Sequence, residues 1–229
     1  MKKNLLLIGG SSDIGSDLIN LIDKKKYNIY YTYNSNKKKI NNVNSFQIDL
    51  SSLEDIDKLI QHLKKKKIKF DNVIFLQGVI YSLSLSKYSD KKIYNTFLVN
   101  TLSIIFITKK ILTLLKKDSL VVLVSSISGS RGSYDPIYSA SKAALHGFTK
   151  SMSQWLTPKT KIICLCPGPV KETTNFKRFS KKRQDFHIKK NPLKKLINSK
   201  EFARILLDVT KPHWKFANGS IIEINGGVY

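Results

Sequence analysis

A short apolar run that ends in a glycine-rich turn constrains the fold of this chain more than any other feature. Residues 4–8 contain four consecutive apolar residues and lead directly into Gly9-Gly10-Ser11-Ser12-Asp13-Ile14-Gly15. Apolar residues at helical spacing follow, at Leu18, Ile19 and Ile22. A strand, a glycine turn and a helix in this order let the backbone approach a pyrophosphate at the helix N-terminus. An ordinary strand–helix turn can also contain glycine, so the motif needs support from the rest of the chain.

Strand and helix patterns alternate along the whole sequence. The predicted strands cover residues 4–8, 28–33, 45–48, 71–76, 119–124, 161–166 and 220–224, and the longest predicted helices cover about 90–116 and 136–156. Near-continuous apolar strands separated by helices are typical of a parallel sheet covered on both faces. With right-handed crossovers, the order predicts an α/β, doubly wound Rossmann fold with a central, mostly parallel seven-stranded sheet. No Pro/Gly-rich linker interrupts the 229 residues, which favours one domain over 1–229.

The strong positive charge has three candidate meanings: nucleic acid, a membrane surface or an anionic ligand. The formal net charge is +24, but the lysine runs at 24–26, 37–39 and 64–67 fall at element ends and loops, as solvated surface does. Lysine, asparagine and isoleucine are abundant throughout, which indicates compositional bias, and we expect no specific nucleic-acid partner. No run of 18 apolar residues occurs, and the N-terminal run is too short for a signal peptide. We therefore expect a cytoplasmic protein with no membrane partner.

The two cysteines, Cys164 and Cys166, lie two positions apart in an apolar run. In a strand they face the same way and cannot easily pair with each other. The chain has no further cysteine and no clustered histidines in sequence. We therefore expect both thiols to be packing residues and expect no metal site.

The stretch Tyr138-Ser139-Ala140-Ser141-Lys142 carries the clearest chemistry. Residues four apart lie one turn apart on the same face of a helix, so the Lys142 ammonium should lie beside the Tyr138 phenol. A nearby positive charge favours the phenolate and lowers the tyrosine pKa toward working pH, which suits proton transfer to a substrate oxygen. Tyr-x-x-x-Lys alone is a weak motif. Here Ser126 stands twelve residues earlier, at the end of a predicted strand.

Together these residues resemble the short-chain dehydrogenase/reductase family in its single-domain form of about 250 residues, over nearly the whole chain. Gly9, the Ser11-Ser12 pair, Ile14 and Gly15 match its glycine motif, and Asp49 matches its acidic residue near the adenine. Pro167-Gly168 and Gly226-Gly227 match two later turns of the family. Asn100, Ser126, Tyr138 and Lys142 match its catalytic residues.

The resemblance implies hydride transfer between a nicotinamide cofactor and a carbon that bears a carbonyl or secondary alcohol oxygen. Tyr138 would donate or remove the proton, Lys142 would lower the tyrosine pKa and bind the nicotinamide ribose, and Ser126 would stabilise the developing alkoxide. Asn100 would hold a water that links Lys142 to solvent. The implied cofactor site comprises Gly9, Ser11, Ser12, Asp13, Ile14, Gly15, Tyr33, Asn34, Ser35, Asp49, Leu50, Gly78, Asn100, Tyr138, Lys142, Pro167, Gly168, Val170 and Thr173.

The end of the second predicted strand bears on the choice of cofactor. An acidic residue there binds the ribose 2′-hydroxyl of NAD, and none occurs in residues 32–36. Lys37, Lys38 and Lys39 follow, and lysines can accommodate a 2′-phosphate. We therefore favour NADP(H), with NAD(H) as the open alternative and a solvated lysine loop as the plain reading.

The chain departs from the family pattern in three places. Asp13 replaces the middle glycine of the turn, where it could cap the helix, but its charge would disfavour a pyrophosphate unless the side chain points away. Phe75-Leu76-Gln77 replaces Asn-Asn-Ala before Gly78. Glu172 stands near the expected threonine, with Thr173 and Thr174 after it.

Residues 171–200 are the predicted substrate lid, in the region where this family varies. The segment is strongly basic, with Phe176, Phe179 and Phe186 interleaved. A cationic lid could attract an anionic or carrier-linked substrate, so a 3-oxoacyl-carrier-protein-type reductase ranks slightly above a reductase in sugar or polysaccharide assembly. A non-catalytic dinucleotide-binding scaffold on the same fold is the remaining alternative. The resemblance also implies a homodimer or homotetramer formed through the helices around 90–116 and 136–156.

Overall fold

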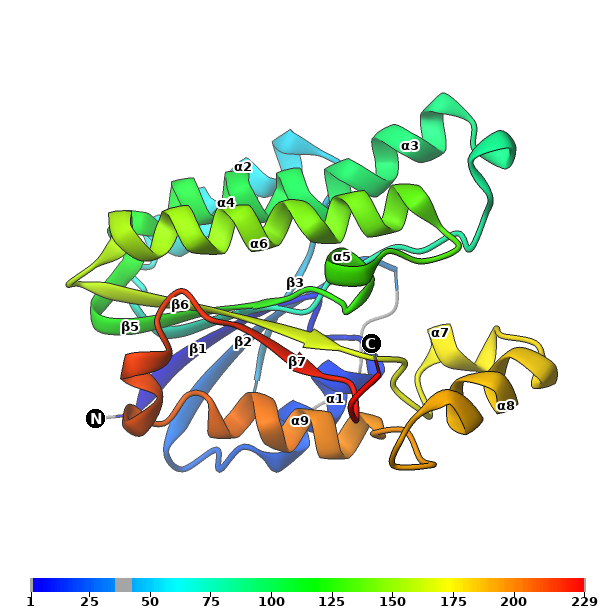
Figure 1. Ribbon diagram of the computed structural model, residues 1–229. Helices are drawn as coiled ribbons and strands as arrows, with labels where there is room; N and C mark the ends of the chain where they lie inside the picture. Colours follow the sequence, from blue (N-terminus) through cyan, green and yellow to red (C-terminus); the bar gives the residue numbers. More distant parts are fainter. Residues whose placement is uncertain (1, 36–42, 229) are drawn as a thin grey trace.

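A seven-stranded sheet forms the centre of the molecule in a computed structural model that describes residues 2–35 and 43–228 (Figure 1). Every strand pair is parallel, and the order is β3-β2-β1-β4-β5-β6-β7. The strands are β1 (Lys3–Ile8), β2 (Tyr27–Tyr33), β3 (Asn44–Gln47), β4 (Phe70–Phe75), β5 (Leu115–Val124), β6 (Thr160–Pro167) and β7 (Ile221–Ile224). The predicted doubly wound fold is confirmed, and the order reverses between β1 and β4, where such sheets bind ligands.

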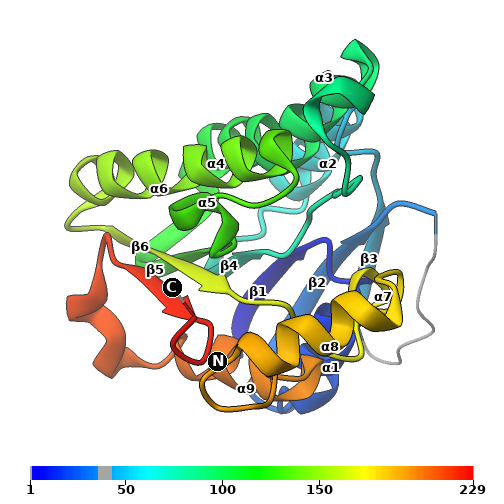
Figure 2. The same ribbon diagram turned by 45° about the vertical axis from the view of Figure 1, so that its right-hand side comes forward.

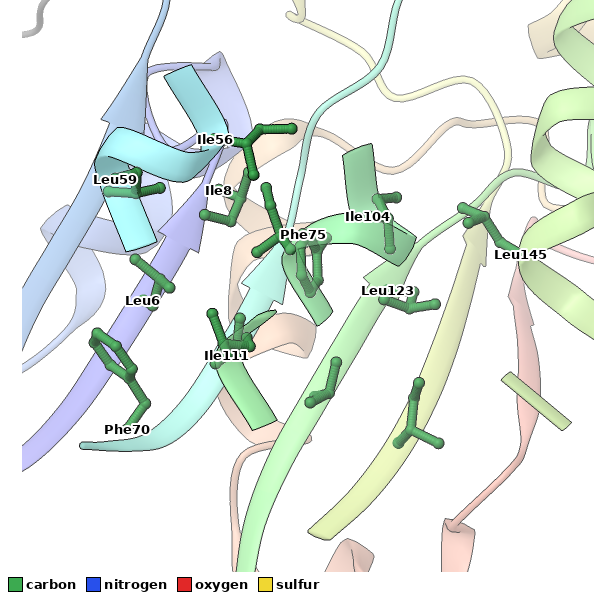
Figure 3. Close-up of a cluster of buried hydrophobic side chains, with 14 of the residues drawn as sticks. Leu6, Ile8, Ile56, Leu59, Phe70, Phe75, Ile104, Ile111, Leu123 and Leu145 are labelled. Atoms are coloured by element: carbon green, nitrogen blue, oxygen red, sulfur yellow. The ribbon is translucent and has the colours of Figure 1, made fainter. Parts of the chain in front are cut away.

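Helices cover both faces of the sheet (Figures 1 and 2). One face carries α1 (Asp13–Leu21) and α9 (Ser199–Asp208), and the other carries α2 (Leu53–Lys65), α4 (Ser103–Ile111) and α6 (Pro136–Leu156). Strand residues Leu6, Phe75 and Leu123 point into the second layer, where Leu59, Ile104 and Leu145 meet them (Figure 3). Because both faces of the strands are buried, the apolar runs seen in the sequence are continuous.

Local capping explains where the main helices begin. Ser12 and Ser52 accept backbone N–H groups of α1 and α2, and Asp135 accepts the N–H of Tyr138 at the start of α6. Pro136 occupies the first helical position of α6, where its missing N–H is not needed. Asn198 and Glu201 form a capping box at the start of α9.

The predicted helix over 90–116 is a chain of four segments. They are α3 (Asp90–Phe97), a π-helical stretch η2 (Leu98–Leu102), α4 and a 3-10 turn η3 (Leu112–Leu114). By length and composition this stretch could cross a membrane, and 44% of its apolar window is buried inside the protein. Ile104, Ile107 and Ile111 lie fully buried against the sheet, as the core helix of an α/β domain requires.

Residues 171–200 form a separate projection beside the carboxyl ends of the strands (Figures 1 and 2). It contains α7 (Thr174–Lys177) and α8 (Lys181–Lys190), and a parallel bridge between Lys171 and Asn198 closes its base. The shorter elements η1 (Leu85–Lys87), α5 (Ser128–Arg131) and η4 (Pro212–Ala217) complete the fold. We call residues 172–197 the lid segment.

Candidate functional site

Four side chains predicted from the sequence meet at the carboxyl ends of β4 and β5. Ser126 is the second residue after β5, and its side chain lies close enough to the Tyr138 phenol to offset part of the rise in the phenol's pKa that burial causes. The Ser126 Oγ also accepts the N–H of Ser128 at 3.1 Å, which fixes its position. Ser125 faces the other way, because its hydroxyl donates to the Lys142 carbonyl at 2.9 Å.

Lys142 is held inside the protein by backbone carbonyls. The residue is 3% exposed, and its Nζ donates to the Val124 carbonyl at 2.9 Å and to the Gln77 carbonyl at 3.4 Å. These oxygens belong to the ends of two neighbouring strands. Burial lowers the pKa of Lys142 to about 8 because the charged form loses hydration.

The Tyr138 phenol differs from the sequence expectation. Burial raises its pKa to about 12, and the nearby Ser126 hydroxyl offsets this rise only in part. The Lys142 Nζ lies 6.0 Å from the centroid of the tyrosine ring and is directed at carbonyl oxygens. Desolvation of the phenolate therefore outweighs the effect of the lysine.

Asn100 lies in the π-helical stretch η2 and is fully buried. Its Oδ1 accepts the Val79 N–H at 2.8 Å, and its Nδ2 donates to the Val79 carbonyl and to the Ser141 Oγ, both at 3.0 Å. A π-helical turn at a functional position is a recurrent feature of proteins. Here it directs the amide toward the loop after β4.

Gly78 keeps the space between these residues open. A Cβ there would lie 3.4 Å from the Lys142 Nζ and 3.8 Å from the Asn100 Oδ1. Lys142 and Asn100 therefore converge on a bare stretch of backbone. This is the one position of the strand-four motif at which the chain keeps the family residue.

The glycine turn after β1 fits a pyrophosphate. Gly9 has φ +76°, and a Cβ there would come within 2.9 Å of the Gln77 backbone nitrogen. A Cβ on Gly15 would collide with the Gly10 backbone. Ser12 caps α1 by accepting the Gly15 N–H at 3.1 Å. The result is a tight, partly buried backbone turn at a helix N-terminus, the setting in which phosphates bind.

Other predicted cofactor residues lie along the same sheet edge. Tyr33 is the last residue of β2, and the next two residues, Asn34 and Ser35, are exposed. Lys37–Lys39 fall outside the described residues. Asp49 is exposed, and its Oδ1 accepts both the N–H and the hydroxyl of Ser51. The structure also places Ser11 in the turn, Ile14 at the start of α1 and Leu50 against the core.

The end of β6 supplies the base of the lid segment. Pro167 ends the strand, Gly168 donates its N–H to the Ile224 carbonyl at 3.0 Å, and Val170 is buried. The Thr173 hydroxyl donates to the Val170 carbonyl at 2.8 Å and caps α7 by accepting the Phe176 N–H. Its hydroxyl is thus occupied by local structure.

Asp13 points away from the glycine turn. Its Oδ2 accepts the backbone N–H of Thr174 at 2.7 Å and the Thr174 hydroxyl at 2.8 Å. Ser12, not Asp13, caps α1, so the helix-capping interpretation of Asp13 is wrong. The aspartate instead joins the glycine turn to the first helix of the lid segment.

Gln77 is buried beside the site. Its Nε2 donates to the Ser103 Oγ at 3.3 Å, while its Oε1 has no hydrogen-bond partner among the described residues. Leu76, next to it, packs on the opposite side of the sheet, against the core that includes Leu18. We find no structural reason for glutamine at position 77.

Asp135 organises the site and was not predicted from the sequence. It is 2% exposed and accepts hydrogen bonds from the Tyr138 N–H at 3.0 Å, the Tyr88 hydroxyl at 2.7 Å and the Ser82 N–H at 2.8 Å. The carboxylate therefore ties the loop after β4 to the start of α6. The Asp-Pro pair before an apolar helix is the signal that would have revealed it.

Cationic groups of the lid segment lie near the start of α6. The Arg183 guanidinium stacks 3.8 Å over the Phe179 ring and is partly buried. Burial lowers the pKa of His187, and the positive charges of Arg183 and Arg131 lower it further. Arg131, on α5, therefore lies near His187 together with Arg183 of α8.

Comparison with known proteins adds a family match. The sequence model of the short chain dehydrogenase family matches residues 3–184. A 3-oxoacyl-acyl-carrier-protein reductase of Buchnera aphidicola is 26% identical over 241 residues, covering 100% of this chain and 98% of the relative.

Solved structures agree with this match. A Brucella melitensis structure, described as a short-chain dehydrogenase/reductase of the glucose/ribitol dehydrogenase type, has a TM-score of 0.91 and 26% identity, covering 100% of this chain and 99% of the other. A Burkholderia cenocepacia short chain dehydrogenase in complex with NADP has a TM-score of 0.90 and 20% identity, covering 99% and 97%. Both superpose over nearly the whole of this chain.

Proposed function

Because the chain belongs to the short-chain dehydrogenase/reductase family of oxidoreductases, we propose that it reduces a carbonyl compound to a secondary alcohol with NADPH. One observation carries the proposal: Lys142 lies beside Gly78 and 6.0 Å from the centroid of the Tyr138 ring, and Ser126 lies close enough to the phenol to offset part of the rise in its pKa that burial causes. The opposite direction, alcohol oxidation, uses the same groups.

The residues divide the chemistry among themselves. NADPH, when bound, supplies the hydride. Tyr138 donates its phenolic proton to the substrate oxygen, and a pKa of about 12 keeps that proton in place at neutral pH. The Ser126 hydroxyl would orient the same oxygen, because it lies close enough to the phenol to offset part of the burial-induced rise in its pKa. Lys142 is fixed by two strand-end carbonyls in a position to bind the cofactor ribose.

The phosphates and the adenine end would be held by the turn after β1 and by the end of β2. The backbone of residues 9–15 would take the pyrophosphate, since a Cβ at Gly9 or Gly15 has no room. Tyr33, Asn34 and Ser35 carry no acid, and three lysines follow them. These features support NADP(H) over NAD(H), and the Burkholderia neighbour contains NADP.

The substrate is proposed to carry negative charge. Arg131 of α5 and Arg183 and Lys190 of α8 lie close enough to His187 for their positive charges to add to the lowering of its pKa by burial. An acyl chain on an acidic carrier protein has this property, and the Buchnera relative acts on such a substrate by its name. We propose a 3-oxoacyl-carrier-protein-type reductase in which residues 171–200 form the lid of a single domain.

The test is the substitution Tyr138→Phe, which removes only the phenolic oxygen. We expect turnover of 3-oxoacyl thioesters to fall by about 10²–10⁴-fold while NADPH binding, measured by fluorescence titration, is kept. Tyr134→Phe, an exposed tyrosine in the adjacent turn, is the control and should keep full activity. Binding of NADPH by the wild type without turnover of any carbonyl would identify a non-catalytic dinucleotide-binding protein instead.

A further inference from the structure

A cluster of soft metal-binding side chains lies on the sheet face opposite Ser126, under α6. Cys164 and Cys166 project from the same face of β6, and His146 of α6 meets them. The Cys166 Sγ lies 3.3 Å from the His146 Nε2 and 3.9 Å from the Cys164 Sγ. All three donor atoms lie within 4.8 Å of one another.

These separations suit a shared ion better than a disulfide. Metal–sulfur bonds of about 2.3 Å and metal–nitrogen bonds of about 2.0 Å put tetrahedral ligands about 3.8 Å apart for two sulfurs and about 3.5 Å for sulfur and nitrogen. The observed 3.9 Å and 3.3 Å lie close to both values. A disulfide needs its sulfurs about 2.0 Å apart, which residues two apart in a strand do not reach without distortion.

A fourth ligand position is also provided. The Ser125 Oγ lies 3.0 Å from the His146 Nε2, beside the same nitrogen that faces Cys166. Glu223 of β7 pairs with Cys166 in the sheet register, so its carboxylate starts from the same face. Oxygen from Ser125, from Glu223 or from a water would complete four-coordination.

We propose that His146, Cys164 and Cys166 bind one Zn²⁺ ion. Two thiols and a neutral imidazole take up the ion, and the two thiol protons pass to the buffer, so the site of two thiolates and Zn²⁺ is neutral. That neutrality suits a location where both cysteines are fully buried. Thiolate and imidazole ligands with no acidic cage select zinc over magnesium or calcium.

The ion would have a structural role next to the catalytic residues. Ser125 donates to the Lys142 carbonyl and precedes Ser126, so the cluster touches both β5 and α6. A metal there would link β6 to the helix that carries Tyr138 and Lys142. It would not touch the substrate, because Ser125 and Ser126 face opposite ways.

The experiment uses the full chain, purified without a histidine tag and kept reduced with a non-chelating thiol-free reductant. Metal is measured by mass spectrometry, removed by a chelator and replaced by Co²⁺, whose thiolate complexes give an ultraviolet charge-transfer band. We expect one tetrahedral Co²⁺ per chain, displaced by Zn²⁺, and a Zn²⁺-dependent rise in melting temperature. Cu⁺ is tested in the same displacement assay.

The variants make the outcome decisive. Each of the variants Cys166→Ser and His146→Ala should lose the Co²⁺–thiolate band or the tetrahedral Co²⁺ spectrum. The control variant His62→Ala, which replaces an exposed histidine on α2, should keep both signals. Circular dichroism checks that each variant is folded. Cys164→Ala removes the other thiol and leaves a small apolar side chain, which a packed core tolerates. A wild type without the band, or a band that survives both Cys164→Ala and Cys166→Ser, would show that these side chains only pack. Displacement of Co²⁺ by Cu⁺ but not by Zn²⁺ would also overturn the proposal.

Discussion

Lys142 is a buried side chain that loses its hydration when the chain folds. It is 3% exposed and is surrounded by carbonyl oxygens, not by a carboxylate. Its pKa is about 8 in the folded chain and 10.5 ordinarily. Below pH 8 the lysine is charged in both the folded and the unfolded chain, and the folded chain carries the full desolvation penalty. As pH rises above 8, the folded chain loses this proton first, so the penalty is relieved.

This difference predicts a pH-dependent effect of Lys142→Met. We expect the free energy of unfolding of the wild type, minus that of the variant, to increase by about 2 kcal/mol from pH 7.5 to pH 9.5. Urea unfolding at several pH values measures it, and taking the difference cancels the titration of the other lysines. Lys150→Met, an exposed lysine on the same helix, should give a flat profile. A flat profile for Lys142→Met would mean that the lysine is hydrated.

The residue scale also shows what the sequence could reveal. The spacing of Tyr138 and Lys142 on one helix, and of Ser126 before them, was enough to predict which side chains the structure brings together. The direction of the Tyr138 pKa was not predictable, because it depends on burial by distant parts of the chain. His146 was missed beside the cysteines because α6 and β6 meet only in the folded molecule.

At the scale of elements, the contact between Asp13 and Thr174 joins the glycine turn after β1 to the lid segment. One carboxylate oxygen holds both the N–H and the hydroxyl of the first residue of α7. A net hydrogen bond of about 1 kcal/mol corresponds to about a fivefold change in the population of an opened lid. The lid segment is rich in lysine and arginine side chains that are mostly exposed already, so local opening of its backbone is what would let trypsin cut there.

We therefore expect trypsin to cut Asp13→Ala within the lid segment about fivefold faster than the wild type. Asp13→Asn keeps an oxygen acceptor and should fall between the two. Mass spectrometry of the early fragments locates the cut, and melting curves check that the global stability is unchanged. Equal cutting rates in all three proteins would mean that the contact does not hold the lid segment.

Element boundaries differ in how well the sequence predicts them. The limits of α6 at 136 and 156 match the prediction, because Asp135 and Pro136 mark its start locally. The π-helical stretch in the predicted helix over 90–116 could not be read from the sequence. It accompanies the pairing of Asn100 with Val79, a contact 21 residues away along the chain.

At the scale of the whole molecule, the net charge of +24 creates a field that attracts anions. If NADPH is the cofactor, its binding should be weakened by salt, since the screening length shrinks to about 10 Å at 0.1 M. We expect the KM for NADPH to rise several-fold between about 0.02 M and about 0.2 M NaCl, with kcat nearly constant. NADH lacks the 2′-phosphate and should show a smaller rise. A KM for NADPH independent of salt would show that the lysines do not contribute.

Assembly into a homodimer or homotetramer stays a prediction, as does a cytoplasmic location. Leu102 and Leu112, in the helical stretch expected to meet a partner, are 37% and 43% exposed. Sedimentation velocity at several concentrations measures the assembly directly.

The double pairing of Asn100 with Val79 has a consequence for how this protein can change. The Asn100 amide hydrogen-bonds the backbone of Val79 and not a side chain of the loop. Substitutions at positions 79–81 can therefore change the side chains that border the site without moving the helical stretch that carries Asn100. The loop can therefore acquire new chemical preferences by single substitutions while its course is preserved. If the side chains of the loop vary while the helical stretch that carries Asn100 stays constant, the same fold can accept different substrates.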